Sequence, residues 1–134
     1  MAGYSATPLA KKLSLKDGLR VFWQEMPPSV EAEIASAGLS LVRLAKPEPP
    51  VDAAHVFVTR RADLDAAIQA IRPMLAPAGF LWVSWPKKGS GLDSEVNEHE
   101  VRDAALPTGL VDVKVCAVDE TWSGLKLVIR RELR

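Results

Sequence analysis

A loop rich in lysine, glycine and serine holds the residue types of this sequence that are best suited to bind a ligand. It reads Trp85-Pro86-Lys87-Lys88-Gly89-Ser90-Gly91 and follows an apolar run. Glycine-rich backbone can present several N–H donors to one anion, and lysine ammonium groups add positive charge. The spacing differs from the phosphate-binding loop Gly-x-x-x-x-Gly-Lys-Ser/Thr, so it does not predict nucleotide hydrolysis. The alternative interpretation is a solvated connector with Trp85 buried in the core.

The predicted ligand site lies where this loop meets the ends of two predicted parallel strands. Open α/β sheets bind ligands at the carboxyl ends of their strands, and the positive ends of the following helices point toward the same mouth. The favoured partner is therefore a small anionic ligand, such as a phosphate or a carboxylate, beside a tryptophan ring. The predicted wall consists of Trp85, Lys87, Lys88 and Ser90, with Thr59 across from them.

A tryptophan in a predicted turn is the second unusual feature. Trp122 lies in the segment Asp119-Glu120-Thr121-Trp122-Ser123-Gly124. A large ring in a loop needs a pocket, a partner or a place in the core. Two interpretations stay open: Trp122 closes the core beneath a hairpin, or it contacts a ligand or partner.

Residues with catalytic or metal-binding chemistry are few and scattered. His55 and His99 lie in different predicted elements, and neither has a second ligand at metal-binding spacing. Cys116 lies in an apolar strand, which predicts a buried, inert thiol. Ser84 lacks the Gly-x-Ser-x-Gly pattern of a hydrolase nucleophile. We therefore predict no catalytic residue set and no metal site.

The composition indicates a soluble globular protein. The 134 residues suit a single domain spanning 1–134, and 17 basic residues balance 17 acidic ones. A formal net charge of zero gives no general attraction to nucleic acid or to anionic lipid. A single cysteine, no signal peptide and no apolar run long enough to span a bilayer favour the cytoplasm.

Strands and helices alternate along the predicted chain. Apolar runs predict strands at 20–23, 39–44, 55–59, 80–85, 111–118 and 125–133. Helical periodicity and capping residues predict helices at 7–13, 27–37, 60–75 and from 93 or 94 to 106. This alternation predicts an α/β doubly wound, mostly parallel sheet. We expect the strand order 2-1-3-4-6-5, with only the last strand antiparallel because a short turn precedes it.

Two sets of residues resemble known families. The stretch Leu75-Ala-Pro-Ala-Gly-Phe-Leu-Trp-Val-Ser84 resembles the corner between the fourth helix and the fifth strand of class I S-adenosylmethionine-dependent methyltransferases. Three longer blocks, at 3–13, 82–91 and 115–129, resemble a family of small, uncharacterised bacterial proteins, a domain of unknown function. This resemblance implies a truncated methyltransferase-like, Rossmann-like fold and no assigned activity.

The cofactor signature of a methyltransferase is missing at both of its positions. The turn after the first strand reads Gln24-Glu25-Met26-Pro27-Pro28, without the glycine that lets backbone approach the cofactor. The second strand leads to Lys46, where an acid would bind the ribose hydroxyls. Glu25 could replace one contact, although a glutamate after a strand is more often solvated. We predict no cofactor.

Three functions remain open from the sequence alone. The leading hypothesis is a non-catalytic or small-anion-binding protein on a degenerate methyltransferase-like scaffold. The second is an enzyme with a diverged S-adenosylmethionine site. The third is a protein–protein interaction module that acts through the hairpin or through the first helix, where Lys11 and Lys12 lie.

Overall fold

A single six-stranded sheet forms the centre of the fold. The structure is a computed structural model that describes residues 7–134, so the predicted family pattern at 3–6 lies outside the described residues. The strand order is β2-β1-β3-β4-β6-β5, as predicted. The strands are β1 (Arg20–Gln24), β2 (Val42–Leu44), β3 (Val51–Phe57), β4 (Leu75–Pro86), β5 (Leu110–Ala117) and β6 (Trp122–Ile129).

The strand directions confirm that only the last strand runs antiparallel. β2, β1, β3 and β4 pair in parallel, whereas β6 pairs antiparallel with both β4 and β5. β6 therefore starts at the edge of the sheet where the parallel strands end. This direction brings residue 122 to the mouth of the sheet.

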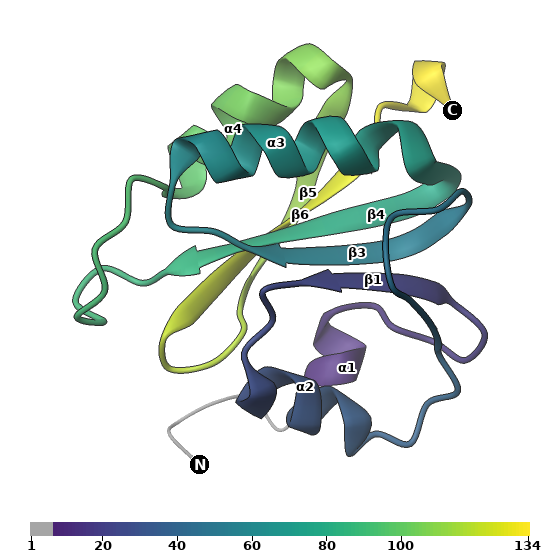
Figure 1. The fold of residues 1–134 in the computed structure, drawn as a ribbon, viewed down its shortest axis with the longest axis horizontal. Coiled ribbons are helices and arrows are strands. Elements are labelled where there is room, and N and C mark those ends of the chain that lie inside the picture. Colours follow the sequence, from purple (N-terminus) through teal and green to yellow (C-terminus); the bar gives the residue numbers. More distant parts are fainter. Residues whose placement is uncertain (1–6) are drawn as a thin grey trace.

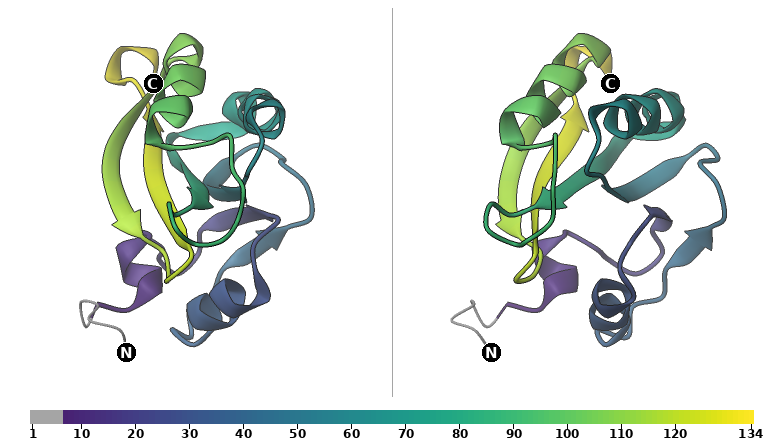
Figure 2. Two further views of the ribbon diagram at one scale, coloured as in Figure 1. Left: turned by 90° about the vertical axis from the view of Figure 1, so that its left-hand side faces the viewer. Right: turned by 60° about the vertical axis from the view of Figure 1, so that its left-hand side comes forward.

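Helices cover both faces of the sheet (Figures 1 and 2). On one face lie α1 (Leu9–Lys12) and α2 (Pro28–Ala35), and on the other lie α3 (Arg61–Ile71) and α4 (Glu98–Ala105). Short 3₁₀ turns follow at Arg72–Met74, Leu106–Thr108 and Arg131–Leu133. None of the helices between residues 7 and 134 is long and apolar enough to cross a lipid bilayer.

The layer of α3 and α4 forms one of two apolar cores. The predicted helical stripe of α3 is buried against the sheet, with Leu64, Ala67, Ile68 and Ile71 at 3% exposure or less. Arg61 joins the two helices, because its guanidinium pairs with Glu100 at 2.8 Å and with Asp103 at 2.9 Å.

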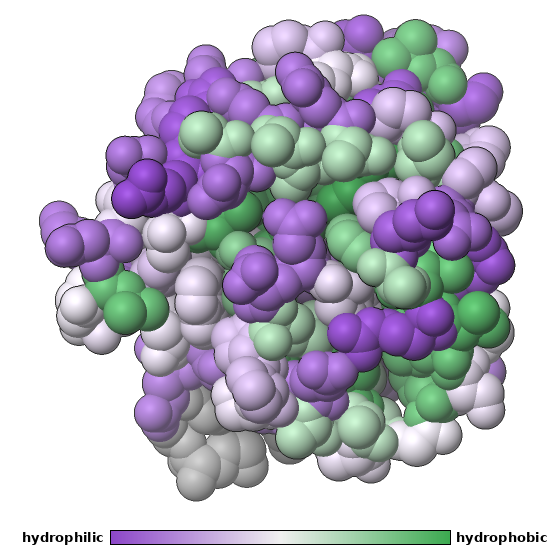
Figure 3. All heavy atoms as spheres, in the orientation of Figure 1, coloured by the Kyte–Doolittle hydropathy of each residue, from purple (hydrophilic) through white to green (hydrophobic). Residues whose placement is uncertain are grey.

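In Figure 3, hydrophilic side chains cover much of the outer surface, with apolar ones showing between them.

The strand pair β3–β4 is longer than predicted. β3 begins at Val51 and β4 at Leu75, and the extra residues of β4 form a register shift. Residues 76–79, which lie between the predicted helix and the predicted strand, are therefore part of a bulged strand. A Cβ atom on Gly79 would lie 2.7 Å from the carbonyl oxygen of Val51, so glycine is needed here for close strand approach.

Helix α4 begins later than predicted. Asn97 is its N-cap, and the side-chain oxygen of Asn97 accepts a hydrogen bond from the Glu100 N–H at 2.9 Å. Ser94, one of the two predicted caps, has another role, because its hydroxyl donates to the Val96 carbonyl at 2.9 Å. The neighbouring Glu95 N–H donates to the Thr59 carbonyl at 2.8 Å. These bonds hold residues 94–96 against the end of β3.

The layer of α1 and α2 encloses polar groups within a second apolar core. The indole N–H of Trp82 donates to the Leu13 carbonyl at 3.0 Å and ties the end of α1 to the sheet. His55 lies in the middle of β3 at 1% exposure, and its Nε2 shares a 2.7 Å hydrogen bond with the Ser84 hydroxyl. The His55 Nδ1 atom has no partner among the described residues. Burial lowers the pKa of His55 from 6.5 to about 3.

The buried state of His55 predicts an acid sensitivity. Because His55 stays neutral in the folded protein and titrates near 6.5 when unfolded, the unfolded chain binds more protons as the pH falls below 6.5. His55 therefore does not lower the free energy of unfolding above pH 6.5. Between pH 6.5 and pH 3 it lowers this free energy by a few kcal/mol in order of magnitude. Urea unfolding at several pH values should show this loss, with a smaller loss in His55→Gln and an unchanged loss in the exposed control His99→Gln. An NMR titration in which the His55 ring gains a proton near pH 6.5 in the folded state would contradict it.

Candidate functional site

The ends of β1 and β3 diverge at the carboxyl edge of the sheet. From β1 the chain passes through α2 to β2 on one side, and it then returns to β3 on the other side of β1. The loop after β1 leads to the face of α2, whereas the loop after β3 leads to the face of α3 (Figure 1). Open α/β sheets bind their ligands in the crevice at such a switch point.

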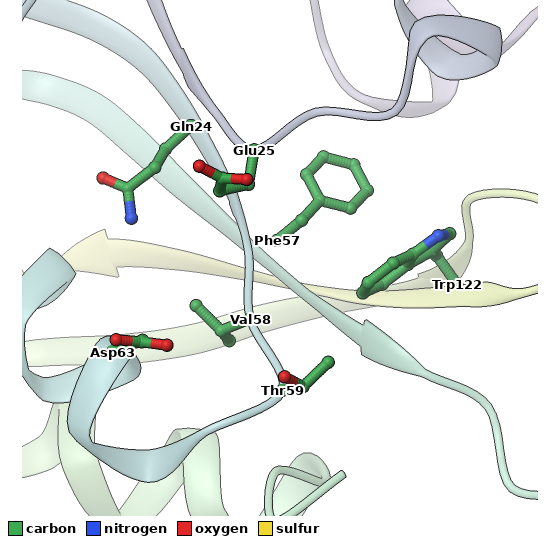
Figure 4. Close-up of a pocket in the computed structure, with 7 residues that line it drawn as sticks. All are labelled: Gln24, Glu25, Phe57, Val58, Thr59, Asp63 and Trp122. Atoms are coloured by element: carbon green, nitrogen blue, oxygen red, sulfur yellow. The ribbon is translucent and has the colours of Figure 1, made fainter. Parts of the chain in front are cut away.

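A pocket of about 450 Å³ occupies this crevice (Figure 4). We call it the switch-point pocket. Its lining residues come from the end of β1, the end of β3, the first turn of α3 and the start of β6: Gln24, Glu25, Phe57, Val58, Thr59, Asp63 and Trp122. Pockets of about 300–1,000 Å³ commonly hold small organic ligands.

The polar and apolar parts of the pocket lie on different sides. In the view of Figure 4, Gln24 and Asp63 lie opposite the rings of Phe57 and Trp122, and Glu25 lies between them. Two carboxylates, an amide and a hydroxyl therefore meet an aromatic wall. None of the seven residues that line this pocket carries a positive charge.

Glu25 has an unusual backbone conformation at the first residue after β1. Its φ angle is +56°, in the left-handed region where residues other than glycine are uncommon. Such strain occurs at functional sites more often than elsewhere, because the surrounding structure must stabilise it. The turn after β1 thus has a left-handed backbone without a glycine, and it places a carboxylate in the pocket.

Trp122 is held in place by the turn that precedes it. The carboxylate of Asp119 accepts hydrogen bonds from the backbone N–H groups of Thr121 and Trp122, both at 2.8 Å. The Trp122 ring then meets Phe57 edge to face, with ring centroids 5.1 Å apart. Trp122 is partly buried against the second core, as one interpretation predicted, and it also lines the pocket. Contact with a ligand or partner stays a prediction.

The predicted wall residues are divided between the pocket, the core and the surface. Thr59 lines the switch-point pocket. Trp85 is 8% exposed and packs in the core of α3 and α4, because strand residues alternate between the two faces and Ser84 takes the other one. Lys88 is exposed, whereas Lys87 and Ser90 are partly buried.

The loop after β4 uses several of its polar groups within the chain. The Lys87 N–H donates to the Thr121 carbonyl at 2.7 Å, and the Ser90 N–H donates to the Lys87 carbonyl at 3.1 Å. The Glu95 carboxylate accepts a 2.9 Å hydrogen bond from the Arg61 N–H, at the start of α3. A carboxylate of the chain therefore already occupies one of the positive helix ends expected to attract an anion.

Four pocket residues had no signal in the sequence. Glu25 and Trp122 were noticeable by position, whereas the other four residues besides Thr59 look like ordinary strand and helix residues: Gln24, Phe57, Val58 and Asp63. Their grouping depends on the strand order, which places 24, 57 and 122 at one edge. No group of three or more His, Cys, Asp or Glu side chains within residues 7–134 could hold a metal ion.

Comparison with known proteins gives a family and a fold. The sequence profile of the family described as "Protein of unknown function (DUF3052)" matches residues 32–131. The block at 3–13 lies outside the matched region. No curated protein matches the chain in sequence.

Solved methyltransferase structures share the fold at low sequence identity. A SAM-dependent methyltransferase from Aquifex aeolicus is 14% identical with a TM-score of 0.61, covering 90% of this chain and 88% of its own. Magnesium protoporphyrin IX methyltransferase from Synechocystis PCC 6803, solved with bound SAH, is 12% identical with a TM-score of 0.55, covering 84% of this chain and 75% of its own. LepI in complex with SAM is 16% identical with a TM-score of 0.53, and the 91% of this chain that aligns spans only 39% of LepI. The fold is thus that of the class I methyltransferases, as the sequence predicted, and at these identities the likeness concerns the fold alone.

The lysine loop remains a predicted anion site with a direct test. Replacing both Lys87 and Lys88 by alanine should leave the melting temperature nearly unchanged, because surface lysines contribute little stability. The double variant should lose any thermal shift caused by a phosphorylated or carboxylated ligand, and that shift in the wild type should weaken with salt. A double variant with a full ligand response would place the anion site elsewhere.

Proposed function

The chain belongs to the DUF3052 family of proteins of unknown function, and we propose that it binds a small organic molecule in the switch-point pocket. The ligand carries hydroxyl or ammonium donors beside a flat apolar group. The observation that carries this proposal is the coincidence of the pocket with the point where the strand order reverses.

The lining residues support hydrogen-bond donors on the ligand. Ionised Glu25 and Asp63 can only accept hydrogen bonds, and the Thr59 hydroxyl and the Gln24 amide can donate or accept. An ammonium group or a pair of hydroxyls would satisfy these acceptors. A ligand anion placed here would face two like charges.

The aromatic side supports a flat apolar part of the ligand. Phe57 is 4% exposed and fixed by its contact with Trp122 and by a stack on His55 at a centroid distance of 4.5 Å. Trp122 keeps part of its surface open. Packed aromatic rings lose little conformational freedom on binding, so they suit the recognition of a ring or a hydrocarbon group.

Glu25 provides a direct test of this proposal. Glycine adopts positive φ without strain, so Glu25→Gly should keep or raise the melting temperature while it removes a carboxylate. In a thermal-shift screen of nucleosides, sugars and amines, a ligand at about 100 times its dissociation constant should stabilise the wild type by about 2.7 kcal/mol. Hits should lose most of this effect in Glu25→Gly and in Asp63→Asn, and keep it in Glu48→Gln, an exposed acid outside the pocket.

Tryptophan fluorescence gives an independent reading. Trp122 is the only tryptophan among the pocket residues, so a bound hit should change the emission of the wild type and leave that of Trp122→Phe nearly constant. Hits that respond equally in all pocket variants would show that the site lies elsewhere and would overturn the proposal.

A diverged S-adenosylmethionine site is the second candidate. The left-handed backbone at Glu25 favours it, because the turn keeps a conformation that glycine supplies in cofactor-binding folds. Two features oppose it: the Glu25 side chain stands where backbone alone would approach the cofactor, and basic Lys46 follows closely after β2.

Calorimetry separates the two candidates. We expect no measurable heat of binding for S-adenosylmethionine or its demethylated product at micromolar protein concentration, because the glycine turn and the acid after β2 are both missing. The Glu25→Gly variant is the matched control, since it restores a glycine at this turn. A micromolar dissociation constant for the wild type would favour the enzyme.

A further inference from the structure

Lysines gather on the face of the sheet that α1 covers, away from the switch-point pocket. We call Lys12, Lys16, Lys114 and Lys126 the lysine cluster. They come from α1 and the segment that follows it, and from the neighbouring strands β5 and β6, so two distant parts of the sequence contribute. The zero net charge of the chain conceals this local excess of positive charge.

Two members of the cluster lie directly opposite each other in the sheet. Lys114 on β5 is in register with Lys126 on β6. Like charges at directly opposed positions destabilise a sheet. Burial lowers the pKa of Lys126, and the charges of Lys114 and Lys16 lower it further. The folded chain therefore keeps these ammonium groups together at a cost in stability.

Both ammonium groups are held in fixed positions at the end of α1. Lys126 donates a 3.0 Å hydrogen bond to the Ser14 hydroxyl, and Lys114 donates a 3.0 Å hydrogen bond to the Lys12 carbonyl. The Lys126 ammonium also lies over the Phe80 ring, 4.5 Å from its centroid. An ammonium has three N–H donors, so each of these hydrogen bonds leaves two for a ligand.

Ser14 has a strained backbone at the same place. Its φ angle is +65°, and Ser14 and Glu25 are the only residues other than glycine with positive φ in the part of the chain that the structure describes. The Ser14 hydroxyl accepts from Lys126 and can still donate its own hydrogen. This conformation ends α1, because the Leu15 N–H donates to the Ala10 carbonyl at 2.9 Å and the Ser14 N–H donates to the Lys11 carbonyl at 3.0 Å. The helix end thus fixes the Ser14 hydroxyl beside Lys126.

No acidic side chain of the described structure pairs with the cluster. Every ion pair recorded within residues 7–134 uses an arginine, and residues 1–6 contain no aspartate or glutamate. The positive charge of these lysines is thus available to an anion from outside the chain.

We propose that Lys114, Lys126 and Ser14, with Lys16 beside them, bind a phosphate group of a small molecule. Two ammonium groups and one hydroxyl lie beside the C-terminal end of α1, and their remaining N–H and O–H donors suit one oxyanion. A nucleic acid would need a row of contacts along its backbone, and the neutral chain offers no general attraction to one. This site is separate from the switch-point pocket and does not depend on the function proposed for it.

Inorganic phosphate is the probe for this site. Amide NMR spectra recorded with phosphate, against chloride at equal ionic strength, should shift at residues 14–16, 114 and 126. Lys114→Gln and Lys126→Met should each weaken the apparent affinity by about tenfold, because each removes charge-assisted hydrogen bonds. Lys46→Gln, an exposed lysine on the far side of the sheet, is the matched control and should bind as the wild type does.

Stability without phosphate distinguishes a binding site from a structural contact. If the cluster is a binding site, Lys126→Met should melt at the same temperature as the wild type or higher, because the methionine keeps the apolar stem and relieves the repulsion. Ser14→Gly should also melt no lower, because it relieves the strain at positive φ, and it should weaken phosphate binding. A lower melting temperature in Lys126→Met with an unchanged phosphate response would overturn the proposal.

Further outcomes would also contradict the site. If Lys46→Gln weakened the affinity for phosphate as much as the cluster variants do, phosphate binding would be nonspecific. The lysines could instead bind a short DNA duplex or anionic vesicles and give no response to phosphate. That result would show that they recognise a macromolecule or a membrane, and it would contradict the proposed small-molecule site. If Lys126→Met fails to fold, the exposed residue Lys114 still decides the matter through Lys114→Gln.

Discussion

The position of β1 between β2 and β3 determines where the switch-point pocket lies. Crossovers between parallel strands are right-handed, so neighbours on opposite sides of β1 require helices on opposite faces. α2 and α3 therefore lie on opposite faces of the sheet (Figure 1), and the switch-point pocket lies between the two strand ends. Every residue of the switch-point pocket lies close to this divergence. The chemistry of the pocket depends on its side chains, but its position follows from the chain path.

The strand order and directions were predictable, since apolar runs, glycine and proline positions and a short last turn contain that information. The boundaries of the elements were less predictable. The sequence of residues 75–79 resembles a turn, and only the close approach of Gly79 to the Val51 carbonyl shows why these residues belong to β4. Asn97 was missed as a cap because Asp93 and Ser94 precede it with the same chemistry. At the site, Thr59 was predicted and lines the pocket, whereas Trp85 packs in the core. The sequence around Glu25 does not predict its left-handed backbone, because glutamate rarely adopts positive φ.

The charges of the chain balance overall but separate in space. Carboxylates of Glu25 and Asp63 line the switch-point pocket, whereas lysines collect beside α1 on the sheet face. Arginines pair with acids in the recorded ion pairs and join helices to one another. Residues of the same formal charge thus serve different purposes, because guanidinium groups form several directed bonds and ammonium groups act as compact charges. Net charge alone would have hidden both regions.

The turn before β6 forms a self-contained unit. The Asp119 carboxylate accepts hydrogen bonds from two backbone N–H groups of the turn, and the Val118 N–H donates to the Trp122 carbonyl at 2.9 Å. The turn therefore needs few bonds from the rest of the molecule to keep its shape. Because β6 runs against its neighbours, this unit is also the one that brings an aromatic ring to the strand ends. Insertions or exchanges within residues 118–122 could therefore reshape one wall of the pocket while the sheet stays intact. One wall of the pocket thus depends on a short segment that few bonds from the rest of the fold constrain.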